Sequence, residues 1–142
     1  MKVSALRPSD APAVADVSAS CFETPWTVAD LEREIARDVA RACAAWIDGV
    51  VVGYGVAYVI AGEAEVLTLG VEPDHRGRGV GRRLLCALVE GCERAHLEVR
   101  ADNRAACALY ERSGFERVSV RSAYYGDGQD ALLMAWTRPS SP

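Results

Sequence analysis

The sequence predicts one α/β domain in which helices flank a mixed central sheet. Segments with strand and helix periodicity follow in the order strand, two helices, three strands, helix, strand, helix and two strands. A chain of 142 residues has room for one domain with a sizeable core, and no repeat, low-complexity segment or linker divides it. We therefore expect a single domain over residues 1–137 and a disordered tail over residues 138–142.

Two helices are predicted after a first strand over residues 2–6. Ser9 or Asp10 is a candidate N-cap for a helix that runs to residue 21, and Thr27 is a candidate N-cap for the next helix. Short polar side chains favour these positions because they accept hydrogen bonds from the unpaired N–H groups of the first turn.

Three strands follow the two helices. Residues 41–47 and 50–60 are β-rich, and the Asp48-Gly49 pair between them is the dipeptide that a tight hairpin with positive φ angles prefers. Residues 64–71 form the next predicted strand, which runs directly into a glycine-rich loop.

The second half of the chain begins with a predicted helix after that loop. Its apolar residues share one face, which we expect to pack on the sheet: Val80, Leu84, Leu85, Leu88, Val89 and Cys92. Residues 96–100 form a predicted strand, Asn103 is a candidate cap of the next helix, and Gly114 is its expected stop. Strands over residues 116–122 and 131–136 complete the sheet.

The composition is that of an ordinary globular protein and excludes several classes. The net charge of −4 argues against a general nucleic-acid-binding protein, since that role needs a basic face. No apolar stretch approaches the length of a membrane span, and the N-terminus lacks an apolar signal core. We therefore expect a cytoplasmic protein with neither a membrane nor a nucleic-acid partner.

The five cysteines and two histidines predict no metal site. The cysteines form no CxxC pair, and neither histidine lies at a ligand-like spacing from them. An odd number of cysteines scattered through apolar runs indicates reduced core thiols. His75 is expected to be exposed beside the glycine loop.

The most informative segment is the basic glycine loop within residues 71–85. Gly77, Gly79 and Gly81 leave backbone N–H groups uncovered at a helix N-terminus, where the macrodipole is positive. The basic residues around these glycines are Arg76, Arg78, Arg82 and Arg83. This arrangement suits a small phosphorylated ligand, and a flexible turn that is merely basic is the alternative.

Two familiar nucleotide-binding motifs do not fit this loop. A Walker loop has Lys and then Ser or Thr after its last glycine, whereas Arg82 and Arg83 follow Gly81. A dinucleotide fingerprint has the spacing Gly-x-Gly-x-x-Gly, which the three glycines lack.

Glu98 and Tyr110 are the candidate catalytic residues. Glu98 lies between apolar neighbours on an inner strand, so its side chain either faces a cleft or forms an ion pair with Arg100 or Arg121. Tyr110 lies near the end of the following helix, where a phenol could give a proton to a departing thiolate. The alternative for Tyr110 is a core aromatic whose hydroxyl is bonded at the edge.

Aromatic residues beside predicted turns are candidates for a substrate mouth. Trp26, Tyr124 and Tyr125 are these residues, although loop aromatics also cover small cores. Glu63 and Glu65 flank the strand before the glycine loop and are rival bases, for which we expect a place at the solvated edge of the sheet.

The segment Arg76-x-x-Gly79-x-Gly81 resembles the acyl-CoA motif of the GNAT N-acetyltransferase superfamily, which is Gln or Arg-x-x-Gly-x-Gly or Ala. The predicted element order is also similar to that fold over almost the whole chain. Further segments resemble the RimI branch, which acetylates the N-terminal alanine of the eighteenth small-subunit ribosomal protein. These segments are Thr24-Pro25-Trp26, Val71-Glu72-Pro73-Asp74, Leu97-Glu98-Val99-Arg100, Asn103, Ala108-Leu109-Tyr110-Glu111, Gly114-Phe115, Tyr124-Tyr125 and Asp130-Ala131-Leu132-Leu133-Met134.

The resemblance implies a GNAT fold, acetyl-CoA as cosubstrate without a metal, and the N-terminus of a ribosomal protein as substrate. The implied cofactor-binding residues are Leu69, Gly70 and Val71 for the acetyl-pantetheine arm, Arg76, Gly77, Arg78, Gly79, Val80, Gly81 and Arg82 around the pyrophosphate, and Asn103. Glu98 would be the general base and Tyr110 the general acid, while Trp26 and Tyr124 would contact the substrate.

Two alternatives use the same cofactor residues. One is a GNAT enzyme that acts on lysine or on a small-molecule amine, and the other is a CoA-binding module without turnover. One departure from the family pattern is a shorter segment between Arg82 and Glu98, which shortens the helix after the glycine loop or its exit.

Overall fold

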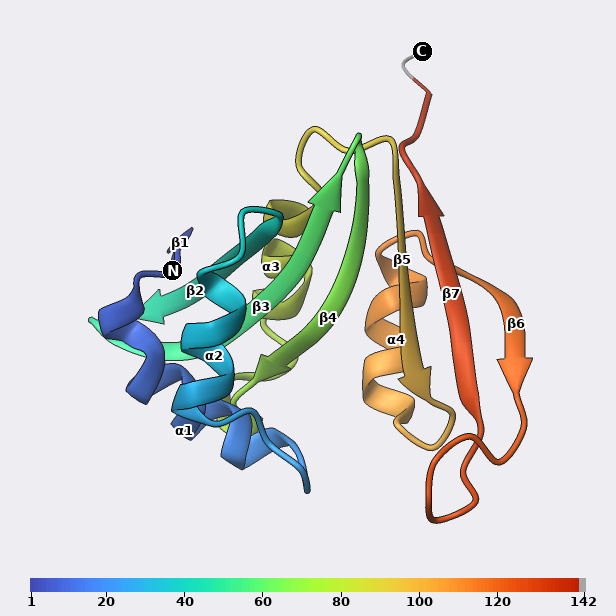
Figure 1. Ribbon diagram of the computed structural model, residues 1–142, viewed down its shortest axis with the longest axis horizontal. Helices are drawn as coiled ribbons and strands as arrows, with labels where there is room; N and C mark the ends of the chain where they lie inside the picture. Colours follow the sequence, from blue (N-terminus) through green and yellow to red (C-terminus); the bar gives the residue numbers. More distant parts are fainter. Residues whose placement is uncertain (141–142) are drawn as a thin grey trace.

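The structure, a computed structural model that describes residues 1–140, contains a seven-stranded sheet with helices on both faces (Figure 1). The strands are β1 (Lys2–Ala5), β2 (Ala40–Ile47), β3 (Val50–Ile60), β4 (Glu63–Val71), β5 (Arg94–Arg100), β6 (Glu116–Arg121) and β7 (Ala131–Thr137). The helices are α1 (Ala11–Cys21), α2 (Val28–Ile35), α3 (Val80–Val89) and α4 (Arg104–Arg112). The predicted order of elements is confirmed, with short 3₁₀ turns added before α1 and α3.

The sheet has the strand order β1-β2-β3-β4-β5-β7-β6, and β4 and β5 are its parallel pair. A parallel connection needs a crossover, which α3 provides. The pairing of β4 with β5 extends only from Glu63–Arg94 to Val66–Leu97. Beyond this point the two strands diverge toward their carboxyl ends, and a gap opens in the middle of the sheet (Figure 1).

Two apolar cores lie on the two faces of the sheet. The larger core lies under α3 and α4 and includes Leu84, Leu88 and Met134, all fully buried. The smaller core lies under α1 and α2 and includes Leu31 and Tyr54. The predicted apolar face of α3 therefore packs on the sheet as expected.

Local signals located the turns and most caps correctly. Asp48 and Gly49 both have positive φ angles, +50° and +77°, as the predicted hairpin requires. Thr27 forms a capping box with Asp30, and the Asn103 side chain accepts a hydrogen bond from the Ala106 N–H at 3.1 Å. Gly114 follows α4 with a φ of +95°.

Other expectations of the sequence were wrong in detail. Asp10 precedes α1, but its carboxylate accepts the Arg7 N–H at 2.9 Å and does not cap the helix. Cys92 follows the end of α3 at Val89, so it is buried in the exit from the helix. That exit is tight because Gly91 adopts a φ of +75°.

The cysteines and the end of the chain also differ from expectation. Cys43, Cys92 and Cys107 are buried thiols, whereas Cys86 is exposed and Cys21 is half-buried.

Arg138, the first residue of the expected tail, donates its backbone N–H to the Glu93 carbonyl at 2.8 Å. Residues 141–142 of that tail lie outside the described residues. No helix within residues 1–140 is long and apolar enough to cross a membrane.

Gly70 of β4 should be intolerant of a side chain. A Cβ at this position would lie 2.9 Å from Cε1 of Tyr54, whose hydroxyl is bonded to Ser18 and Thr68 in the core. We expect Gly70→Ala to lower the free energy of unfolding by about 1–3 kcal/mol, because the ring cannot move aside. Urea denaturation would measure the loss.

Gly126→Ala is the matched control for this substitution. A Cβ on Gly126 would meet nothing within 4 Å, so its effect should stay within about 0.5 kcal/mol. An equal loss in both variants would contradict the steric argument.

Candidate functional site

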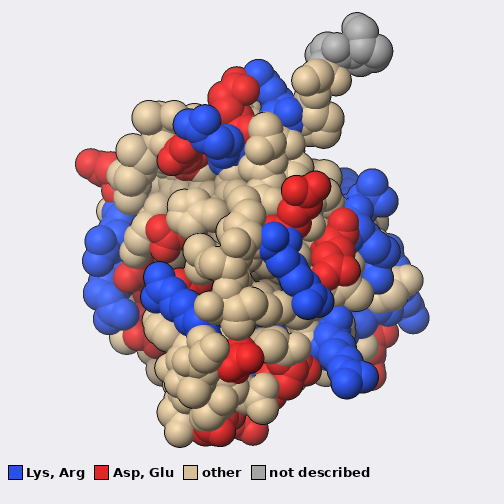
Figure 2. Space-filling view, turned by 90° about the vertical axis from the view of Figure 1, so that its right-hand side faces the viewer, with Lys and Arg blue, Asp and Glu red and all other residues tan. Residues whose placement is uncertain are grey.

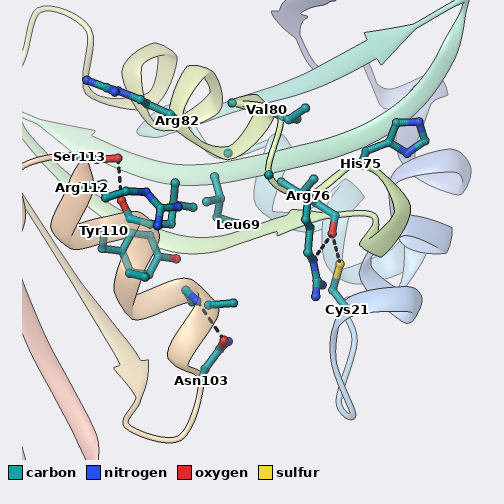
Figure 3. Close-up of a pocket in the computed structure, with 18 of the residues that line it drawn as sticks. Cys21, Leu69, His75, Arg76, Val80, Arg82, Asn103, Tyr110, Arg112 and Ser113 are labelled. Carbon is teal, nitrogen blue, oxygen red and sulfur yellow. Dashed lines mark hydrogen bonds between the residues drawn. The ribbon is translucent and has the colours of Figure 1, made fainter.

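A cavity of about 790 Å³ opens between α3, α4 and the end of β4 (Figure 3). Its size is within the range of small-molecule sites. The predicted cofactor-binding residues that line it are Leu69, Val71, Arg76, Gly77, Gly79, Val80, Gly81, Arg82 and Asn103. Gly70 and Arg78 are outside its lining, whereas Tyr110 is part of it.

The glycine loop presents a row of backbone donors at the start of α3. Gly77 and Gly79 have φ angles of +77° and +83°, and a Cβ on either would face open space. Backbone hydrogen bonds stop at the Arg76 N–H, which donates to Pro73, and resume at the Arg83 N–H, which donates to Gly79. The N–H groups of residues 77–82 are thus available to an anion.

α3 and α4 meet at Gly81 and Leu109, which both line the cavity. A Cβ on Gly81 would lie 2.7 Å from a terminal methyl group of Leu109, so glycine permits this approach. Asn103 begins α4, and its amide oxygen is already bonded to the Ala106 N–H. The amide NH₂ of Asn103 is therefore the group that remains for a ligand.

Most arginines without a carboxylate partner lie on the elements that border the cavity. The arginines of residues 1–140 that form no ion pair are Arg41, Arg76, Arg78, Arg82, Arg83, Arg104 and Arg112. All except Arg41 lie in the glycine loop or on α3 and α4. By contrast, basic and acidic residues are mixed on the face shown in Figure 2. Three of the unpaired arginines, Arg76, Arg82 and Arg112, line the cavity, whereas Arg83 donates to the Met1 carbonyl at 3.1 Å. An anion in the cavity would therefore meet three guanidinium groups that have no carboxylate partner.

Tyr110 directs its hydroxyl into the cavity (Figure 3). The residue is 7% exposed and its ring packs against Phe115, but the hydroxyl makes no hydrogen bond within the described chain. Burial raises the pKa of Tyr110, and the neighbouring Cys107 and Tyr54 add to the effect. The phenol is therefore a buried aromatic that keeps its proton at neutral pH.

The end of β4 offers two more backbone donors. The Glu72 N–H donates to the Val52 carbonyl of β3 at 2.8 Å. Because N–H groups alternate along a strand, those of Leu69 and Val71 point away from β3, toward the gap left by β5. The Val71 carbonyl on that side accepts from Arg76 Nε at 2.9 Å and from Cys21 Sγ at 3.3 Å (Figure 3).

Glu98 lies just past the last pair of β4 with β5. Its neighbours Leu97 and Val99 are buried on the side of α3 and α4, so Glu98 faces the opposite side of the sheet. Its carboxylate is exposed and lies 3.5 Å from Arg121 Nη2, which is one of the two ion-pair partners that the sequence offered. Glu98 and Tyr110 thus approach the gap from opposite faces.

The predicted substrate-contacting residues lie outside the cavity. Trp26 is half-buried in the α1–α2 loop, where its backbone N–H donates to Ser18 Oγ at 2.9 Å. Tyr124 is half-exposed in the β6–β7 loop. Both loops lie at the end of the sheet where β4 and β5 separate (Figure 1).

The other candidate residues, Glu63, Glu65 and His75, each lie beside an oppositely charged or titratable side chain. Glu63 and Glu65 are exposed at the start of β4, next to Arg94 (2.7 Å) and His96 (3.6 Å), away from the gap. The prediction that His75 is exposed is wrong. The side chain is partly buried in the cavity wall, and its Nδ1 lies 3.5 Å from the Glu72 carboxylate. Residues 1–140 contain no group of His, Cys, Asp or Glu side chains that could hold a metal.

Some cavity residues were missed at the level of sequence. Cys21 reaches the cavity from the end of α1, and no sequence signal identified it. Four residues of α4 also line the cavity: Ala105, Ala108, Leu109 and Arg112. Their spacing of three and four residues marks one face of the helix.

Comparisons with known proteins agree with this geometry. The sequence matches the acetyltransferase (GNAT) family over residues 11–115. It is 40% identical to the N-alpha-acetyltransferase RimI of Mycobacterium tuberculosis, over 93% of this chain and 89% of that protein. It is also 39% identical to the uncharacterized protein ML0378 of Mycobacterium leprae, of which it spans only 39%.

A solved structure is similar over nearly the whole chain. The crystal structure of the ribosomal-protein-S18-alanine N-acetyltransferase from Escherichia coli aligns with a TM-score of 0.88 and 30% identity. The alignment covers 99% of this chain and 96% of that one.

Replacing Tyr110 with Phe should leave the fold intact and change its response to alkali. At pH 7 we expect Tyr110→Phe to alter the free energy of unfolding by less than about 1 kcal/mol, because the lost hydroxyl has no partner in the described chain. The raised pKa means that the wild-type protein loses stability above pH ~10, by up to about 1.4 kcal/mol per pH unit, as the unfolded phenol ionises. The variant lacks this loss.

Urea denaturation at pH 7 and between pH 9 and pH 11 would measure both effects. Relative to the wild type, Tyr110→Phe should become more stable as the pH rises. Parallel pH profiles for the two proteins would show that Tyr110 titrates normally and is not desolvated.

Proposed function

Because the chain belongs to the GNAT acetyltransferase family and is an acetyl-CoA-dependent N-acetyltransferase, we propose that its acceptor is the N-terminal α-amine of a protein. The N-terminal alanine of ribosomal protein bS18, in the cytoplasm, is the specific substrate of this proposal. The names and the extent of similarity of the two acetyltransferases above support it. The catalytic domain of the proposal is residues 1–137.

The gap between β4 and β5 is the observation that carries the proposal. On one side lies the cavity with Tyr110, and on the other lies Glu98, beside the end of the sheet that bears the two aromatic loops. A reaction at this gap could receive the acyl donor from one face and the amine from the other. Two substrates could then meet without competing for one pocket.

The cavity fits acetyl-CoA in shape and charge. The N–H groups of residues 77–82 and the unpaired arginines suit the pyrophosphate, and Asn103 can donate its amide to the pantetheine arm. The free N–H groups of Leu69 and Val71 suit the thioester carbonyl. The Arg76 guanidinium, which is bonded to the Val71 carbonyl, holds the loop against the strand.

Glu98 and Tyr110 divide the proton transfers of the proposed reaction. An α-amine has a pKa of about 8 and is mostly protonated at pH 7, so Glu98 removes a proton directly or through water. The neutral amine then attacks the thioester and a C–N bond forms. As the C–S bond breaks, Tyr110 donates its proton to the departing thiolate, and the nitrogen releases its second proton to solvent, from which Tyr110 regains one. A desolvated phenol is a weaker acid, but the same dry surroundings also make the thiolate a stronger base.

The acceptor can be identified with peptides that differ in their first residue and carry a free or a blocked α-amine. Thiol release from acetyl-CoA, with mass detection of the product, would measure turnover. We expect turnover on free peptides that begin with alanine and none on the blocked forms. Turnover confined to blocked lysine peptides or to polyamines would reject the N-terminal assignment, and binding of acetyl-CoA without any turnover would reject the catalytic one.

Removing the proposed base and acid should lower the catalytic constant. We expect Glu98→Gln and Tyr110→Phe each to reduce kcat by about 10²- to 10⁴-fold on a saturating alanine peptide, because each removes one proton transfer. Steady-state kinetics with both substrates saturating would measure the loss.

Glu65→Gln is the matched control for these variants. Glu65 is an exposed carboxylate on the neighbouring strand beside His96, away from the gap. Its kcat should stay within about twofold of the wild type. Unchanged kcat values for Glu98→Gln and Tyr110→Phe would overturn the assigned roles.

A further inference from the structure

Arg100, the last residue of β5, connects that strand to the β6–β7 loop. Its Nε and Nη2 donate to the two oxygens of Asp102 at 3.0 Å and 3.1 Å, and the guanidinium also donates to both oxygens of Asp127 in the loop. The Arg100 guanidinium carbon lies 4.8 Å from the centre of the Tyr125 ring. One side chain therefore holds two carboxylates and an aromatic ring.

The β6–β7 loop has an ordered internal structure around this contact. The Tyr125 N–H donates to the Gln129 carbonyl at 3.1 Å, and the Gln129 N–H donates to Asp127 Oδ1 at 3.1 Å. The Ala101 N–H donates to the Asp130 carbonyl at 2.9 Å. The loop is thus a compact turn that is attached to the end of β5 through Asp130 and through Arg100.

This attachment brings the loop beside Glu98. Because residues alternate along a strand, Arg100 shares the face of β5 with Glu98. Burial raises the pKa of Tyr125, and the negative charge of Glu98 raises it further. On the other side, Arg121 pairs with Glu98 and lies 5.3 Å from the ring of Tyr124.

We propose that Arg100 is a positioning residue that closes the β6–β7 loop against β5 and so fixes the wall of the acceptor site beside Glu98. The inference rests on the proposed function, which assigns this loop to the acceptor side. Arg100 does not line the cofactor cavity, so its effect falls on the acceptor and spares acetyl-CoA.

The geometry distinguishes Arg100 from an ordinary surface ion pair. Isolated exposed pairs contribute little, whereas a planar guanidinium that binds two carboxylates and stacks on a ring forms a network. A lysine in its place would keep the charge but could not reproduce this geometry. Arg94, at the opposite end of β5, pairs with Glu63 alone and provides a matched control.

Arg100→Lys, Asp127→Asn and the control Arg94→Gln would be compared with the wild type in full kinetics on an alanine peptide. We expect Arg100→Lys to raise the KM for the peptide about tenfold and Asp127→Asn to raise it in the same direction. The KM for acetyl-CoA should stay within about twofold in every variant, because the cavity is unchanged. Arg94→Gln should leave both constants unchanged.

Chymotrypsin supplies a second measurement, which does not depend on enzyme activity. It cleaves after tyrosine, so a loosened loop should be cut at Tyr124 or Tyr125 about tenfold faster in Arg100→Lys than in Arg94→Gln.

Unchanged peptide KM values, or an equal rise in the KM values for peptide and acetyl-CoA, would overturn the proposal. If the wild type acetylates no N-terminal peptide, the proposed function fails, and the cleavage rates then decide whether Arg100 closes the loop: equal rates overturn it.

Discussion

The site depends on the early separation of β4 from β5. In a fully paired sheet the N–H groups of Leu69 and Val71 would be used by the neighbouring strand. Here the pairing stops at Val66 and Leu97, so these donors have no strand partner and the sheet is open between its two faces. The parallel connection through α3 places the glycine loop at the same end of β4. The backbone donors of the proposed reactive region are therefore N–H groups that no neighbouring strand uses.

The cavity side of the gap combines backbone donors with unpaired guanidinium groups. The protein carries a net charge of −4, yet most arginines without a carboxylate partner lie on the glycine loop, α3 and α4. Arginines elsewhere are largely neutralised by Asp or Glu, as Arg94 is by Glu63. Binding of an anion thus depends on the charge of the residues around the cavity and not on the net charge of the protein. Gly81 adds to this because it leaves room for the Leu109 side chain of α4.

The acid and the base of the proposed mechanism lie in different surroundings. Tyr110 is buried in the apolar core below the cavity and keeps its proton, whereas Glu98 is exposed on the other face beside Arg121. The sheet separates them, so neither hydrogen-bonds to the other while both reach the gap. The loops around Glu98 are held by side chains from the sheet and from α1, as the contacts of Arg100 with Asp127 and of Trp26 with Ser18 show. These contacts hold the proposed acceptor side in place without a ligand.

Features that depend on near neighbours in the chain were determined by the sequence itself. The Asp48-Gly49 turn, the Thr27 and Asn103 caps and the order of the elements follow from φ preferences and hydrogen bonds within a few residues. The glycine loop likewise has its backbone donors and its arginines within a few consecutive residues. These predictions needed no knowledge of what packs against them.

Only the tertiary structure decided the features that join distant residues. It selected Arg121 as the partner of Glu98, assigned Arg100 to Asp102 and Asp127, and brought Cys21 into the cavity. It also ended the β4–β5 pairing at Val66, for which the sequence gives no signal. Each of these outcomes depends on which strands pair, in what register, and on how helices pack over them. Such contacts are set by the whole core and cannot be read from spacing along the chain.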